Sequence, residues 1–118
     1  MIYHMLPEAL WRQQSLNELY EGDTLYSEGF IHCTGERQLL VRVANNFYRD
    51  NAEPFVILCI DEDLVVADVQ WDTVGFLQFP HIYGPLNLDA VVEVIRFPRL
   101  PDGQFVMPPE WESEDIVQ

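Results

Sequence analysis

The chain has 118 residues, an apolar share of 48% and a formal net charge of −14, from six arginines and twenty acidic residues. This length and composition predict one globular domain. The charge disfavours binding to nucleic acids and to anionic membranes, because both require a basic surface. Lysine is absent, which excludes a lysine Schiff base and the lysine of a phosphate-binding P-loop.

The sequence shows no sign of export or of membrane insertion. No apolar run approaches the roughly 18 residues that span a bilayer, and the N-terminus lacks the basic and apolar segments of a signal peptide. The two cysteines, Cys33 and Cys59, both lie in apolar runs and do not suggest a disulfide framework. We therefore expect a soluble, cytoplasmic protein.

The N-terminal half is predicted to contain two strands, each followed by a helix: 1–5, 7–20, 29–33 and 35–49. In the first strand, Ile2 and His4 share one face. The 35–49 segment carries an apolar stripe at 3.6-residue spacing, with Thr34 as its N-cap, and is therefore predicted to be an amphipathic helix.

The C-terminal half is predicted to be mostly strands, over 55–60, 65–72, 79–86 and 90–97. The continuous apolar run 55–60 indicates a central strand covered on both faces. Alternation in 65–72 places Asp68, Gln70 and Asp72 on one face, which is either a polar wall of a site or a solvent-facing surface. We predict an α+β domain over 1–100, a bent mixed or antiparallel sheet with two N-terminal helices, and an acidic, proline-containing tail over 101–118.

Three histidines, His4, His32 and His81, lie in apolar segments far apart in the sequence. Buried histidines need hydrogen-bond partners, so they are either three separate packed residues or the lining of one cleft. In a cleft, neutral imidazoles orient a substrate or move a proton, and we predict this catalytic role. Zinc could also use three histidines, but no pair shows the short spacing of metal ligands, and no metal is expected.

The segment from His32 to Gly35 joins a predicted strand to a predicted helix start. Free N–H groups and the positive end of the helix dipole favour an anion there, so Thr34, Gly35 and Arg37 are predicted ligand-binding residues. An ordinary threonine-capped helix is the alternative. Cys33 could be a nucleophile near a helix N-terminus or a core residue, but it points away from its histidine neighbour.

Three segments together resemble a known family: Ile2-Tyr3-His4, Gly29-Phe30-Ile31-His32-Cys33-Thr34 and Phe79-Pro80-His81-Ile82-Tyr83-Gly84-Pro85-Leu86. From residue 1 to about 98, the chain is similar to the bacterial family called domain of unknown function 952. The resemblance implies an ADP-ribosyltransferase-like fold, a split and strongly bent sheet whose relatives bind NAD in a cleft. It also implies that His4 contacts the nicotinamide ribose and that Tyr83 lies near the ligand.

The same resemblance implies a final glutamate or glutamine that positions the acceptor. Gln78, Asp72 and Glu93 are all imperfect matches to it. The expected function is an enzyme acting on NAD, ADP-ribose or a related nucleotide, with NAD as a substrate. The two N-terminal histidines would hold the ribose, the helix start would hold the phosphate, and His81 would transfer a proton.

Two other functions stay open at this point. One is a non-catalytic module that binds such a ligand or a protein, through the acidic tail and an exposed apolar patch around Trp111. The other is a metal-dependent hydrolase.

Overall fold

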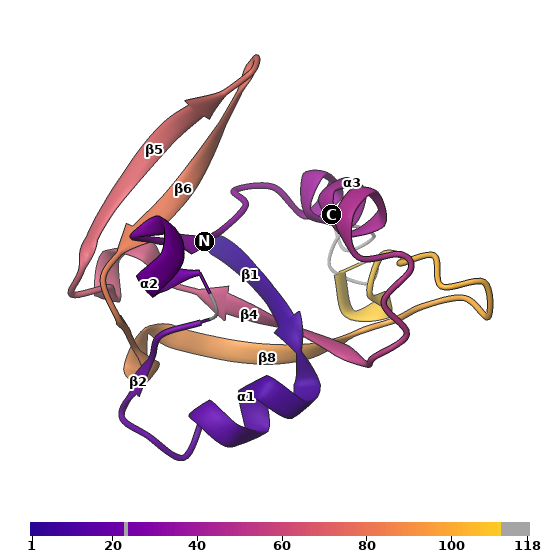
Figure 1. The fold of residues 1–118 in the computed structure, drawn as a ribbon, viewed down its shortest axis with the longest axis horizontal. Helices are drawn as coiled ribbons and strands as arrows, with labels where there is room; N and C mark the ends of the chain where they lie inside the picture. The colour runs from indigo at the N-terminus through magenta and orange to yellow at the C-terminus, as the bar shows by residue number, and fades with distance from the viewer. Residues whose placement is uncertain (23, 112–118) are drawn as a thin grey trace.

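Antiparallel strand pairing dominates the computed structural model, which describes residues 1–22 and 24–111 (Figure 1). The described chain forms three sheets, with strand orders β1-β4-β8, β2-β7 and β3-β6-β5. The strands are β1 (Ile2–Pro7), β2 (Leu19–Tyr20), β3 (Ile31–His32), β4 (Phe55–Ile60), β5 (Asp68–Val74), β6 (Leu77–Tyr83), β7 (Leu86–Asn87) and β8 (Val91–Phe97). The helices are α1 (Glu8–Gln14), α2 (Leu25–Glu28) and α3 (Arg37–Phe47), with short 3-10 turns at Glu62–Leu64 and Leu88–Ala90. The predicted α+β class is confirmed.

Strand β4 is the centre of the first sheet, and all six of its residues are buried. Alternate side chains enter two separate cores: Val56, Leu58 and Ile60 on one side, and Phe55, Ile57 and Cys59 on the other. The prediction of a central strand covered on both faces is therefore confirmed. In β1, likewise, Ile2 packs in the first core and Tyr3 in the second.

The β5–β6 hairpin carries the outer part of the β3-β6-β5 sheet and projects from the body of the molecule (Figure 1). Gly75 at its tip has a φ of +64°, a backbone conformation that glycine adopts without strain. Strand β3 pairs with β6, so that His32 lies directly opposite His81. A bridge between Tyr3 and Thr34 ties this sheet to the first one.

The segment after β8 packs against the second core. Phe105 and Trp111 are fully buried there, beside Leu40 and Ala44 of α3. The predicted exposed apolar patch around Trp111 is therefore wrong, because the ring fills a core position. Of the predicted acidic tail, the described residues pack on the domain, and 112–118 lie outside the described residues.

Two local predictions are corrected. The helix predicted over 7–20 ends at Gln14, because Leu19 and Tyr20 form a strand with β7 and the Tyr20 ring enters the first core. The strand predicted over 29–33 is shortened to β3 and preceded by the short α2, which ends at Gly29 with a φ of +88°. The fold thus has an additional helix before β3.

Candidate functional site

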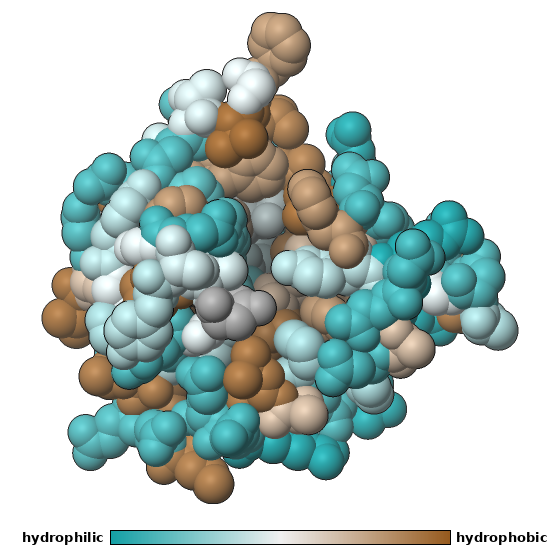
Figure 2. Space-filling view, viewed as in Figure 1, coloured by the Kyte–Doolittle hydropathy of each residue, from teal (hydrophilic) through white to brown (hydrophobic). Residues whose placement is uncertain are grey.

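A cleft of about 660 Å³ lies between β1, α3 and the β5–β6 hairpin. Figure 2 shows the molecule hollowed between the hairpin and α3, with brown hydrophobic side chains around the opening. Apolar and aromatic side chains make most of its wall, and the polar exceptions include His4, His32, Thr34 and His81. The three imidazoles that the sequence singled out therefore line one cleft.

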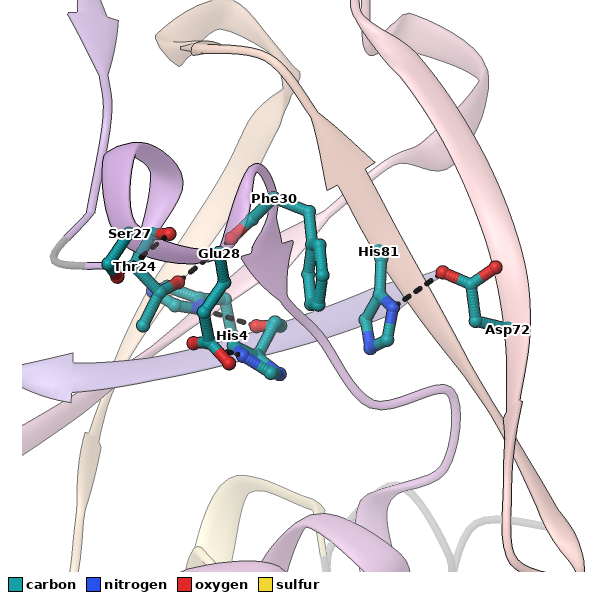
Figure 3. Close-up of polar contacts among 8 residues, drawn as sticks. His4, Thr24, Ser27, Glu28, Phe30, Asp72 and His81 are labelled. Carbon is teal, nitrogen blue, oxygen red and sulfur yellow. Dashed lines mark hydrogen bonds and ion pairs between the residues drawn. The ribbon is translucent and has the colours of Figure 1, made fainter.

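His81 has the most defined environment of the three histidines. Its side chain is 6% exposed, and its Nδ1 lies 2.7 Å from Oδ2 of Asp72 on the neighbouring strand (Figure 3). Tyr83 donates its hydroxyl to the same carboxylate oxygen. These three side chains share one face of the hairpin, because Gln70 pairs with His81 and alternate residues point the same way.

The Asp72 carboxylate fixes the tautomer of His81. The hydrogen bond from Tyr83, followed by that from His81, lowers the pKa of Asp72 below its usual value, so this carboxylate is ionised at neutral pH. The same bond to Asp72 raises the pKa of the Tyr83 hydroxyl. An ionised carboxylate only accepts hydrogen bonds, so Nδ1 of His81 carries a hydrogen, and in the neutral imidazole Nε2 then keeps its lone pair.

His32 lies on β3, which pairs with β6 on the side opposite to β5 and Asp72. Its Nε2 is 2.9 Å from Oε2 of Glu28, one helical turn earlier at the end of α2. The His32 and His81 ring centroids are 5.2 Å apart. The Phe30 ring stacks on the His81 ring, with 4.2 Å between their centroids (Figure 3). Two imidazoles, each with its own carboxylate, therefore face each other across an antiparallel strand pair.

His4 uses both ring nitrogens inside the protein. Its Nδ1 lies 2.5 Å from the carbonyl oxygen of His32, and its Nε2 lies 2.7 Å from the hydroxyl of Tyr20. A carbonyl only accepts, so Nδ1 donates and Nε2 accepts from Tyr20. His4 thus connects β1 with β3 and sets the backbone position of His32, which leaves neither nitrogen for the predicted ribose contact.

The predicted anion site is not assembled at the start of α3. The Thr34 N–H donates to the Tyr3 carbonyl at 2.8 Å, and Glu36 rather than Thr34 is the N-cap. A Cβ added to Gly35 would lie 2.6 Å from the Trp71 ring, so glycine is needed there for side-chain packing. Thr34 still lines the cleft.

Arg37 is also committed to the fold. Its Nε donates to the Tyr3 hydroxyl at 3.1 Å, and its guanidinium carbon lies 4.8 Å from the Trp111 ring centroid. This side chain therefore serves the second core rather than a phosphate in the cleft. Tyr83, the fourth predicted ligand-binding residue, contacts the site through Asp72.

Two other chemical roles were considered from the sequence, a cysteine nucleophile and a metal site. Cys33 is buried, and desolvation raises the pKa of its thiol far above the usual value, which opposes a role as nucleophile. In the described ranges, 1–22 and 24–111, no three His, Cys, Asp or Glu side chains are arranged to hold a metal ion. No ligand set can therefore be named for the metal-dependent hydrolase.

Two partners of the histidines were not predicted as such. Asp72 was placed on a polar strand face and weighed as an acceptor-positioning residue, but not paired with His81. The signal was present in the same-face pattern of Asp68, Gln70 and Asp72. Glu28 lies four residues before His32, a spacing that predicts contact only when a helical turn is expected there.

The fold and the site define a small antiparallel α+β domain with a histidine-lined cleft. The sequence profile of the family described as "Protein of unknown function (DUF952)" matches residues 5–94, and the chain belongs to this family.

Solved structures of one protein share the fold. The crystal structure of CC0527 from Caulobacter crescentus has a TM-score of 0.78 and 26% identity, covering 89% of this chain and 92% of that one. The solution NMR structure of CC0527 has a TM-score of 0.72 and 24% identity, covering 99% and 97%. No curated protein matched the sequence. None of the helices within the described residues has the length and apolar character needed to cross a membrane.

Proposed function

We propose that the protein is an enzyme that performs acid–base chemistry on a small molecule in the histidine-lined cleft. The proposed substrate class is NAD, ADP-ribose or a related nucleotide. One observation carries the proposal: His81 is 5% exposed, lines the cleft and is oriented by Asp72 at Nδ1, and its Nε2 makes no hydrogen bond to the described residues. A fixed imidazole with an available lone pair inside a cleft is suited to accept a proton.

His81 is the proposed general base. When Nε2 takes a proton from a substrate hydroxyl, amine or water, the imidazolium that forms is stabilised by the Asp72 carboxylate at Nδ1. Tyr83 keeps this carboxylate in position by donating to the same oxygen. The carboxylate, the imidazole and the cleft therefore form one functional unit.

His32 is the proposed partner of His81. Its ring is about half exposed and bonded to Glu28, and it lies beside His81 across the strand pair. A substrate group held between the rings would have one imidazole to accept its proton and a second to donate a proton to a leaving atom. Phe30, packed on both rings, keeps water from one side of the pair.

The nucleotide class rests on the ADP-ribosyltransferase-like fold that the family resemblance implies, and on the size of the cleft. Ligand sites for small molecules usually measure roughly 300–1,000 Å³ and have apolar walls with a few convergent polar groups. Phe30 and Phe79 provide flat surfaces for a base ring, and His32 and His81 provide polar contacts for ribose hydroxyls. The phosphates would lie outside the cleft, because none of the six arginines lines it within the described part of the chain.

Isothermal titration calorimetry with NAD and with ADP-ribose tests the proposal, together with NMR detection of product. We expect saturable binding at millimolar ligand or below, weakened in Phe30→Ala and unchanged in Phe76→Ala, a phenylalanine exposed at the hairpin tip. His81→Gln should retain binding and lose turnover. Folded wild-type protein that gives no heat and no NMR shifts with either ligand would refute the nucleotide class, and binding without turnover would indicate a ligand-binding module instead.

A further inference from the structure

Among the described residues, two charged side chains besides the histidines line the cleft, and both are acidic. They are Glu28 and Glu53. None of the arginines lines the cleft; they contact other parts of the described chain. Arg12 and Arg96 pair with Glu8, and Arg49 pairs with Asp102. Arg37 contacts Tyr3 and Trp111, Arg99 donates to backbone carbonyls, and Arg42 is exposed on α3. With a chain charge of −14, this arrangement makes the cleft attractive to cations and repels anions.

The two carboxylates lie toward different ends of the cleft. Glu28 is beside His32, near the part of β1 that contains His4. Glu53 precedes Phe55, which pairs with Pro7 at the other end of β1. Pro7 lies three residues after His4 along the strand, a span of about 10 Å. Arg99 contacts only the backbone carbonyl of Glu53, and the Glu53 carboxylate has no ion-pair partner among the described residues.

The wall between these ends is apolar. It includes Leu6 of β1, Leu40, Val43 and Phe47 of α3, and Phe55 of β4. Such a surface accommodates methylene groups, and aromatic faces also attract ammonium ions. His81, which is 5% exposed, lines the same cleft, and its Nε2 makes no hydrogen bond to the described residues.

We infer that the interior of the cleft binds a linear aliphatic amine, with ammonium groups near Glu28 and Glu53 and methylene groups along the apolar wall between them. The inference rests on the proposed function, since the amine would lie within reach of the same His81 base. A nucleotide bound at the histidine end would keep its phosphates outside the cleft, away from both carboxylates.

Spermidine is the probe, titrated into the full chain by calorimetry at low and at physiological ionic strength. We expect saturable binding that weakens about threefold to tenfold in Glu28→Gln and in Glu53→Gln. Glu93→Gln is the matched control, because it removes one exposed charge on β8 outside the cleft lining. Uncharged 1,8-octanediol, a ligand of similar length, should bind much more weakly.

Equal weakening by all three variants would overturn the inference, because it would show general attraction to an acidic protein. Absence of spermidine binding at millimolar concentration would also overturn it. These results are separable from the nucleotide test: NAD binding without amine binding removes the amine site and leaves the proposed function. Amine binding without NAD or ADP-ribose binding removes the nucleotide class instead.

Discussion

The contact of His4 with Tyr20 gives the sharpest test of how the site is held. His4→Phe keeps the shape of the ring and removes both nitrogens, so the Tyr20 hydroxyl and the His32 carbonyl each lose their hydrogen bond to His4. Tyr20 is fully buried. Removing one member of a buried hydrogen bond costs about 1–3 kcal/mol, and His4 makes two such bonds, so His4→Phe should lower the free energy of unfolding by about 2–5 kcal/mol.

A double-mutant cycle isolates this contact. Tyr20→Phe alone removes the hydrogen bond between the Tyr20 hydroxyl and His4 Nε2 and should cost about 1–3 kcal/mol. The double variant has neither the hydroxyl nor the Nε2 atom, so its loss should fall short of the sum by about 1 kcal/mol or more. Urea unfolding followed by circular dichroism measures each value. Tyr26→Phe, at an exposed tyrosine, should change stability by less than about 0.5 kcal/mol.

Strictly additive losses, or a His4→Phe protein as stable as the wild type, would refute a structural role for His4. In that case the imidazole would be available to a ligand, as the resemblance implied. If the cycle shows coupling, His4 has a structural role. A His4→Phe protein that binds ligand less well would then do so because His32, whose carbonyl His4 holds, has moved.

Three further outcomes are expected. Trp111→Ala should lower the free energy of unfolding by about 3–5 kcal/mol in urea titrations, while Phe47→Ala on the exposed face of α3 changes it little. Alkylation followed by mass spectrometry should show Cys33 protected at pH 8 in the folded protein and modified after unfolding; fast native modification would contradict its burial. Asp72 has a lowered pKa in the fold, so its contribution to stability is present above pH about 4 and lost as the pH falls through the folded value. Asp72→Asn should therefore weaken the acid dependence of stability, and a carboxyl NMR titration that gives an ordinary pKa would refute the Asp72 contacts.

The core strands could be predicted because burial forces a pattern on neighbouring residues. The apolar run of β4 and the alternation in β1 predict which side chains enter a core, and this prediction does not require knowing which strand is their neighbour. The 7–20 segment fails for the opposite reason. Leu16 fits a helical stripe but is 87% exposed, and Tyr20 is drawn into a strand by pairing with Leu86, which no local pattern shows.

The sequence could predict some residues of the cleft, but not how they are arranged. The sequence indicated that His32 and His81 lie in strands, but their opposition depends on a register between residues 49 positions apart. Trp111 was misassigned because the acidic and proline residues around it resemble a solvated tail. Arg37 was predicted to bind phosphate because it lies near a helix start, where an anion is favoured. In the structure its guanidinium group contacts the Tyr3 hydroxyl and the Trp111 ring.

The turn of the β5–β6 hairpin decides whether the proposed base exists. Val74 pairs with Leu77, which leaves a two-residue loop with Gly75 first, the position that a type II′ turn reserves for glycine. Because strand side chains alternate, a slip of one residue would put Asp72 and His81 on opposite faces and separate the carboxylate from Nδ1. A substitution at Gly75 that shifts this register should therefore abolish the orientation of His81 although every residue of the cleft is still present.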